Sequence, residues 1–227
     1  MEVIYEDNHI IAVNKTSSEI VQGDKTGDSP LSDAVKAYIK EKCNKPGEVF
    51  LGVTHRLDRP TSGVILFART SKALTRLNEM FKEKNSIKKI YWAVVDKKQA
   101  AESATLHHWI VRNEQQNKSF AYEKEVPNSK EASLSYKVIG NSDNYFLLEI
   151  ELHTGRHHQI RAQLGAIGCK IKGDLKYGAP RSNPGGGIHL HARKIEFIHP
   201  VSKEKITITA SVPDDQLWKF FEAKNKS

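Results

Sequence analysis

The sequence predicts an α+β fold, a single domain on a mixed, mainly antiparallel β-sheet with flanking helices. Three observations support this prediction. The 227 residues suit one large domain or two small ones, and no linker-like segment divides the chain. Short apolar runs of strand length recur along it. These runs and the helical patterns do not follow the strict βαβ alternation of a parallel sheet.

The N-terminal region predicts two strands and a helix. Residues 3–14 are expected to form two short strands around a turn at Asn8. Residues 31–42 carry apolar side chains at i, i+3, i+4, i+7 and i+8, the spacing of an amphipathic helix. Ser29 can cap this helix, with Pro30 at its first position.

The next region predicts a strand, a helix and a second strand. The run GVILFA (63–68) has the length and composition of a strand buried on both faces. A helix follows from about Ser71, and residues 90–95 again read as a buried strand. Residues 98–131 are polar and irregular, which is typical of a mobile hairpin or an insertion.

The remaining elements follow from turn residues and apolar spacing. They are strands at 134–139 and 145–152 around a turn, a short helix from Gly155 to Ile167 ending at Gly168, a loop at 182–187, a hairpin of 195–198 with 206–210, and a last helix with Leu217, Phe220 and Phe221.

Composition excludes several classes of protein. Hydrophobic residues make up 38% of the chain and charged residues 27%, which indicates a strongly hydrated surface. Cys43 and Cys169 are too few for a disulfide framework or a four-cysteine zinc site. No apolar run approaches the ~20 residues that span a bilayer, and the acidic N-terminus lacks a signal-peptide layout. We therefore expect a cytoplasmic protein that is neither secreted nor membrane-embedded.

The charge balance indicates a polyanionic partner. The net charge is +8 and the pI is about 9.3. Such a basic chain favours a nucleic acid as the partner, although many basic proteins bind none.

Residues 54–63 (THRLDRPTSG) form the first block that could carry chemistry. Asp58 lies between Arg56 and Arg59, whose charges favour its ionised form. The turn that follows could place Asp58 at a strand edge. From the spacing alone, an ordinary surface turn with a salt bridge is the favoured interpretation.

Residues 154–164 (TGRHHQIRAQL) form the second block. On a helix, His157 and Arg161 would share one face and Ile160 and Leu164 another. A rigid arginine there could hold a carboxylate by two hydrogen bonds. The alternative is a basic amphipathic helix at the surface.

Together, HRLDRPTSG, TGRHHQIR and LHARKIEFIHP resemble the successive motifs of the RluA-type pseudouridine synthase family. VIYEDNHIIAVNK, KIYWAVV and KGDLKYG resemble it too, in order and spacing, so the resemblance covers roughly residues 2–212. It implies a catalytic domain on a mixed, mainly antiparallel sheet with a central RNA-binding cleft. It also implies conversion of selected uridines in ribosomal or transfer RNA to pseudouridine, without a cofactor.

The resemblance also assigns residues. Asp58 matches the catalytic aspartate, Tyr91 the tyrosine that packs against the target base, and Arg161 the basic residue paired with the aspartate. Arg56 matches an arginine that fills the gap left by the flipped base. The residues expected to bind RNA are Arg56, His55, Arg59, Arg156, Lys172 and Lys176.

Two departures from the family pattern stand out. Gln163 occupies a position where many relatives have histidine, and Thr16 and Ser17 follow VNK where many have proline and glycine. Neither removes a catalytic residue. No N-terminal S4-type RNA-binding module is expected, because Val3 already matches the catalytic domain.

Positive charge is concentrated between residues 170 and 194, which contain six Lys or Arg and one acid, Asp174. This stretch could contact phosphates, or it could be a solvated charged face. The histidine pairs along the chain lack the spacing of metal ligands, so we predict no metal.

The chemistry is consistent with these residues. A single ionised carboxylate could stabilise a ribose cation, add to the ribose, or abstract a proton, and the sequence does not choose among these routes. A glycoside hydrolase would usually need two carboxylates, and neither block contains a second. The rival hypotheses are a non-catalytic RNA-binding protein and a hydrolase of a nucleoside or RNA glycosidic bond. A monomer is assumed, and the RNA and its uridine are not readable from the sequence.

Overall fold

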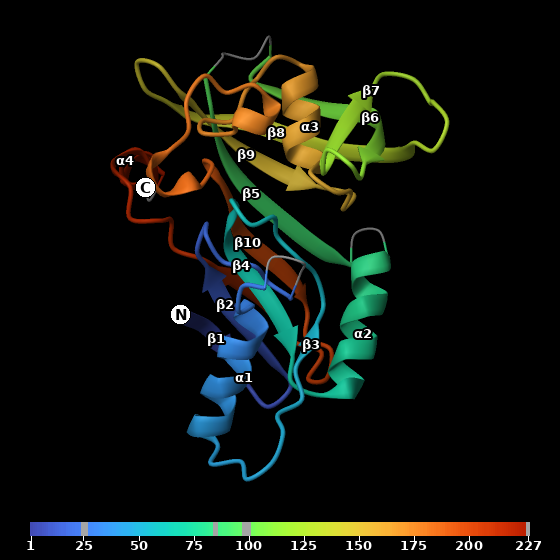
Figure 1. Cartoon of the computed structure of the whole chain (residues 1–227), viewed down its shortest axis with the longest axis vertical. Helices are drawn as coiled ribbons and strands as arrows, with labels where there is room; N and C mark the ends of the chain where they lie inside the picture. The colour runs from blue at the N-terminus through green and yellow to red at the C-terminus, as the bar shows by residue number, and fades with distance from the viewer. Residues whose placement is uncertain (24–26, 84–85, 97–100, 226–227) are drawn as a thin grey trace. The chain divides into compact units, whose positions relative to one another are not determined.

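The computed structural model describes residues 1–23, 27–83, 86–96 and 101–225. The chain forms two compact units, and each is built from segments that are distant in the sequence (Figure 1). The first unit comprises Met1–Ile87 and Arg193–Ser211, and the second comprises Lys88–Ala192 and Val212–Ser227.

The first unit combines antiparallel strands with two helices. Its elements are β1 (Glu2–Glu6), β2 (Ile10–Lys15), α1 (Leu31–Lys42), β3 (Gly52–Val53), β4 (Ser62–Ala68), α2 (Ser71–Lys82), most of β10 (Leu190–Ile198) and β11 (Lys205–Thr209). β2 pairs with β1 and β4, β3 pairs with β4, and β10 pairs with β11. All seven residues of β4 are buried, which confirms the strand that the GVILFA run predicted.

Helix α1 has its predicted extent, Leu31–Lys42, but a different N-cap. Pro30 is its N-cap and no side chain caps it, so the predicted cap at Ser29 with Pro30 inside the helix is wrong. The backbone N–H of Leu31 instead donates to the carbonyl of Ile20 at 2.8 Å. The preceding loop thus satisfies a first-turn donor that helices leave without an intrahelical partner.

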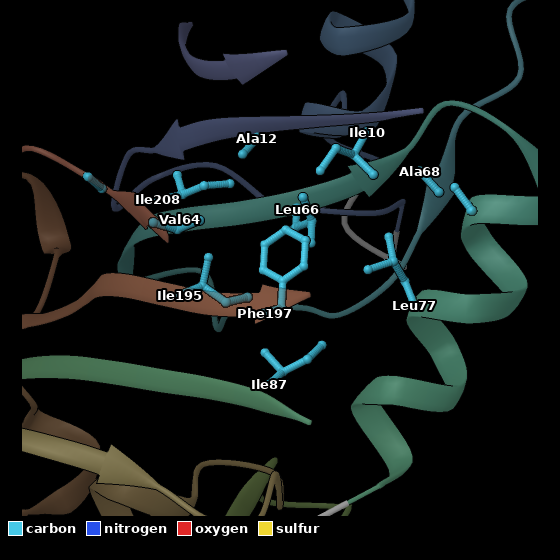
Figure 2. Packing of buried hydrophobic residues seen from close by; sticks show 12 residues of the cluster. Ile10, Ala12, Val64, Leu66, Ala68, Leu77, Ile87, Ile195, Phe197 and Ile208 are labelled. Carbon is cyan, nitrogen blue, oxygen red and sulfur yellow. The ribbon is translucent and has the colours of Figure 1, made fainter. Parts of the chain in front are cut away.

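The core of the first unit lies between its strands and α2. Figure 2 shows Leu66 of β4 and Phe197 of β10 among these buried side chains. The cluster consists of Ile10, Ala12, Val64, Leu66, Ala68, Ala73, Leu77, Ile87, Ile195, Phe197, Ile208 and Ala210. Each fully buried large side chain contributes about 1.5–3 kcal/mol of transfer free energy. The core fixes the ends of β2 and β4, where Lys15 pairs with Gly63.

The second unit is an antiparallel sheet with helices on both faces. Its elements are β5 (Ile87–Val95), β6 (Ser103–Asn113), β7 (Lys118–Tyr122), β8 (Lys130–Asn141), β9 (Phe146–Leu152), α3 (Gln159–Ala166), the 3-10 turns η1 (Leu175–Tyr177) and η2 (Pro184–Gly186), and α4 (Gln216–Lys224). The strand order is β5-β9-β8-β6-β7.

The faces of β5 explain how the two helices pack. Ala93 and Val95 belong to a cluster with Ile160 and Leu164 of α3. Trp92 and Val94 point the other way and join Trp218 and Phe221 of α4. Period-two alternation along one strand thus places α3 and α4 on opposite faces.

One expectation for this unit is confirmed in one of its alternatives, and another is corrected. The segment expected to be irregular contains the paired strands β6 and β7, so its hairpin alternative is confirmed, while residues 97–100 lie outside the described residues. The helix expected from Gly155 starts at Gln159, because His158 adopts a left-handed conformation with φ of 52° and acts as the N-cap.

Candidate active site

Asp58 lies in the segment between β3 and β4, directly before a tight turn. The Thr61 N–H donates to the Asp58 carbonyl at 3.0 Å and closes this turn. Leu57 is buried, Asp58 is half-buried and Arg56 is exposed. The chain is therefore anchored on one side of Asp58, while Asp58 itself keeps part of its surface exposed.

A buried lysine holds the backbone of this turn. Lys15 is 1% exposed, and its Nζ donates to the carbonyls of Thr16 at 2.8 Å, Arg59 at 2.9 Å and Thr61 at 2.7 Å. A longer contact of 3.4 Å reaches the Asp58 carbonyl. Burial lowers the pKa of Lys15 to about 8, although the nearby charges of Glu19 and Asp58 oppose this shift. A lysine at the end of an apolar strand was the only sequence signal for this role.

His55 and Arg59 also have partners within the first unit. The His55 ring stacks on Phe81 with centroids 4.8 Å apart, and its Nε2 accepts from Leu66 N at 3.0 Å. Arg59 Nη2 lies 2.6 Å from Asp28 Oδ2 in an exposed pair, a type worth about 0–1 kcal/mol. These contacts attach the Asp58 segment to its own unit, and RNA contacts of both residues stay a prediction.

Tyr91 lies on β5 of the second unit. It pairs with Ile150 of β9, is half-buried, and packs at the margin of the cluster that includes α3. Its neighbours Ile90 and Trp92 are buried. The Tyr91 side chain therefore leaves the strand on the face that α3 covers.

Arg161 is held by an acidic residue that the sequence analysis missed. Its Nε donates to Asp174 Oδ2 at 2.7 Å and its Nη2 to Asp174 Oδ1 at 2.8 Å. The side chains are 5% and 1% exposed. A guanidinium has five N–H donors, so this pairing is compatible with a second carboxylate partner. The sequence signal for Asp174 was that it is the one acidic residue within the basic stretch 170–194. The predicted shared helical face of His157 and Arg161 is wrong, because His157 precedes α3.

Tyr177 and His158 form a network beside the Arg161–Asp174 pair. The Arg161 guanidinium carbon lies 5.0 Å from the centroid of Tyr177. The Tyr177 hydroxyl accepts from Ser119 N at 2.8 Å and lies 3.0 Å from His158 Nδ1. Burial, and then the Arg161 charge, lower the pKa of His158 far below its usual range, so this imidazole is neutral. The network holds β7 against η1, because Ser119 lies on β7 and Tyr177 on η1.

Gln163 faces the interior. It is wholly buried, and its Nε2 donates to His108 Nδ1 at 3.1 Å while its Oε1 accepts from Gln159 Nε2 at 2.9 Å. Burial lowers the pKa of His108, which fits its acceptor role. The amide thus links α3 to β6, which accounts for a polar residue at this buried position.

The remaining predicted RNA-binding residues are in the second unit and donate to oxygens of the protein itself. Arg156 Nε bonds Glu131 O at 2.9 Å, Lys172 Nζ bonds Asn183 Oδ1 at 2.6 Å, and Lys176 Nζ bonds Asn117 O at 3.0 Å. An ammonium has three donors, so one such bond leaves capacity for a phosphate. Their contacts with RNA stay a prediction.

Two absences concern the described ranges only. Within them, no three His, Cys, Asp or Glu side chains gather closely enough to hold a metal ion. None of the helices described is both long and apolar enough to cross a bilayer.

Comparisons with known proteins found a matching family model and similar sequences. Residues 9–166 match a family model described as RNA pseudouridylate synthase. An uncharacterized RNA pseudouridine synthase of Synechocystis sp. is 30% identical over 94% of this chain and 66% of its own length. The ribosomal large subunit pseudouridine synthase C of Vibrio cholerae is 31% identical over 92% and 64%.

A solved structure shows the same fold. The human RNA pseudouridylate synthase domain containing 4 superimposes with a TM-score of 0.79 at 21% identity, covering 98% of this chain and 92% of that one. The chain spans about two thirds of the length of the curated relatives cited above.

Proposed function

Because the chain belongs to the RNA pseudouridylate synthase family, as its resemblance indicated, we propose that it is an RNA pseudouridine synthase. The observation that carries this proposal is the setting of Asp58. Within the family's most specific motif, this single carboxylate sits on a turn whose carbonyls are fixed by buried Lys15. Such a turn holds a reacting group in place before substrate arrives.

The proposed reaction needs no outside reagent. The N1–C1′ bond of uridine breaks, the uracil turns, a C5–C1′ bond forms, and C5 loses its hydrogen as a proton while N1 gains one. Asp58 carries the negative charge that each route requires, whether it stabilises a ribose cation, adds to C1′ or removes a proton. Arg161 keeps Asp58 ionised, and Asp174 keeps the guanidinium in a fixed orientation.

The other predicted residues handle the RNA. Unstacking the target base costs a few kcal/mol, and stacking on Tyr91 returns about 1–3 kcal/mol. Arg56, which is exposed, fills the gap that the flipped base leaves in the RNA strand. The phosphate contacts are assigned to His55, Arg59, Arg156, Lys172 and Lys176. The proposal invokes no metal or cofactor and places the reaction in the cytoplasm.

The substrate is proposed to be ribosomal or transfer RNA. The Vibrio cholerae relative is named for the large ribosomal subunit, which makes ribosomal RNA the first to examine. A flipped base must come from an accessible loop, so a structured stem-loop is the expected target.

A pseudouridine map of total cellular RNA, with and without the gene, tests the proposal. At least one site should disappear on deletion and return with the wild-type gene, but not with Asp58→Asn. An unchanged map would overturn the proposal. Release of free uracil from RNA would instead indicate hydrolysis of the glycosidic bond.

A further inference from the structure

Lys89 is the first residue of the KIYWAVV block, and no role has been assigned to it above. It lies on β5 two residues before Tyr91, so the two side chains leave the strand on the same face. Both are half-buried. The next residue back, Lys88, points the other way and pairs at the surface with Glu151, with Nζ and Oε2 3.1 Å apart.

The Lys89 ammonium lies against the turn that leads into α3. A Cβ added to Gly155 would be 3.9 Å from Lys89 Nζ. Within the part of the chain that the structure describes, Lys89 forms no hydrogen bond or ion pair. The ammonium therefore lies beside the turn of the TGRHHQIR block, and no anionic side chain among the described residues pairs with it.

This environment is unfavourable for an ammonium alone. Burial lowers the pKa of Lys89, and no acidic group opposes the shift. A desolvated charge without a partner costs free energy. Residues in such settings are typical of sites where a ligand supplies the missing charge.

The chemistry of the ligand follows from its place. Two residues of a strand span about 6.6 Å, a separation comparable to that between a base and the phosphates of its own nucleotide. Phosphodiesters are the anions of RNA, and lysine binds phosphate as a point charge.

We propose that Lys89 binds a phosphodiester of the RNA strand beside the nucleotide that stacks on Tyr91. This inference rests on the proposed function and adds a binding residue to it. It places one backbone contact inside the site, apart from the outer basic stretch of residues 170–194.

The test compares Lys89→Met, which keeps most of the length of the side chain without its charge, with Lys89→Arg and the matched control Lys88→Met. The probe is RNA from cells lacking the gene, labelled with [5-³H]uridine, and the readout is tritium release. Lys89→Met should lower kcat/KM about 10- to 100-fold through KM, the loss expected for a hydrogen bond to a charged group. Lys89→Arg should keep most of the activity, and Lys88→Met should match the wild type.

Two further readouts separate binding from structure. The slope of log(kcat/KM) against log[KCl] should become shallower by about 0.7–0.9 in Lys89→Met only, the value for one phosphate contact. The unfolding temperature of Lys89→Met should stay equal or rise, since a desolvated charge is removed. An unchanged slope, or a lowered unfolding temperature, would overturn the inference.

Failure of the proposed function would look different. Wild-type protein would then release no tritium at all. Filter binding of the same RNA by wild type and Lys89→Met across KCl concentrations would still measure the slope, and equal slopes would overturn the assignment of Lys89 by itself.

Discussion

Asp174 holds Arg161 by two parallel hydrogen bonds of 2.7 and 2.8 Å, in a pair that is almost wholly buried. Removing one partner of a buried pair leaves an uncompensated charge, which is far more costly than the net value of the pair. The orientation of Arg161 therefore depends on a residue 13 positions later in the chain.

Asp174→Asn should reduce both stability and turnover. The free energy of unfolding should fall by about 3–5 kcal/mol, because Arg161 stays buried without its counterion. Tritium release should fall even at temperatures where the variant is folded. Urea unfolding and initial rates check this, with Asp143→Asn in an exposed turn as the control. Wild-type rates in Asp174→Asn would show that Arg161 does not need this partner.

Asp58→Asn should abolish isomerisation. The amide keeps the shape of the side chain but lacks the charge that every proposed route requires. Binding of RNA should persist or tighten, since one negative charge is removed from a site that receives phosphates. The assay is tritium release from C5-labelled uridine, and EDTA should not change the result.

The matched control for Asp58→Asn is Asp28→Asn, which removes the exposed partner of Arg59 in the same unit and should leave the rate near that of the wild type. Arg161→Met should also cripple turnover. Substantial tritium release by Asp58→Asn would refute both the assignment of this residue and the mechanism.

Tyr91→Ala should weaken binding of RNA and lower turnover, because the stacking surface is lost. Tyr91→Phe keeps the ring and should keep binding, and it should slow the reaction only if the hydroxyl moves a proton. Tyr122→Ala, at a tyrosine that is 42% exposed, is the control. Equal activity of wild type and Tyr91→Ala would remove Tyr91 from the site.

Lys15→Met should slow turnover and give a pH-dependent change in stability. The turn carrying Asp58 loses its central donor, so its geometry loosens. The pKa of Lys15 is about 8 in the folded protein and 10.5 when unperturbed. Between these values the unfolded chain holds a proton that the folded chain lacks, so this group adds stability as pH rises.

The stability difference, wild type minus Lys15→Met, should therefore grow between pH 8 and 10.5, by at most about 1.4 kcal/mol per pH unit. Urea unfolding at several pH values measures it, and Lys36→Met on the exposed side of α1 is the control. A stability difference that does not change with pH would contradict the lowered pKa of Lys15.

His189 should make the protein sensitive to acid. Burial, and then the Lys172 charge, lower the pKa of His189 to about 4 from 6.5. Its Nε2 lies 3.1 Å from Asp215 Oδ1, which also caps α4. As pH falls from 6.5 to 4, the unfolded chain takes up a proton that the folded chain does not, so stability falls.

The unfolding temperature of the wild type should therefore fall as the pH is lowered from 6.5 to 4. The unfolding temperature of His189→Gln should fall less steeply. The control is His153→Gln at an exposed position. Parallel curves for wild type and His189→Gln would show that His189 titrates normally in the folded state.

The sequence predicted local features better than distant polar partners. Apolar spacing predicted α1, α2 and β4, because the buried side chains of each element recur at regular intervals within a short segment. The start of α3 was misplaced because no pattern reveals that His158 adopts positive φ. Strand β6 has only two buried residues, His108 and Ile110, among half-buried and exposed ones, which hid it among polar side chains.

In the site too, local motifs were found in the sequence and distant polar partners were not. Motif resemblance assigned Asp58, Tyr91 and Arg161, but Lys15 reaches carbonyls 44 and 46 residues away. Asp174 is reached through a turn whose course depends on tertiary packing. Side chains that bind the backbone of distant loops leave no periodic signal in the sequence.

The discontinuous makeup of the two units has a consequence for synthesis on the ribosome. The core of the first unit needs Phe197 and Ile208, and one core of the second needs Trp218 and Phe221. Neither core can close until these late residues have emerged from the ribosome, which adds about 5–20 residues per second. Nascent chains therefore expose two unfinished apolar surfaces together, and a stall before residue 197 leaves both open to aggregation.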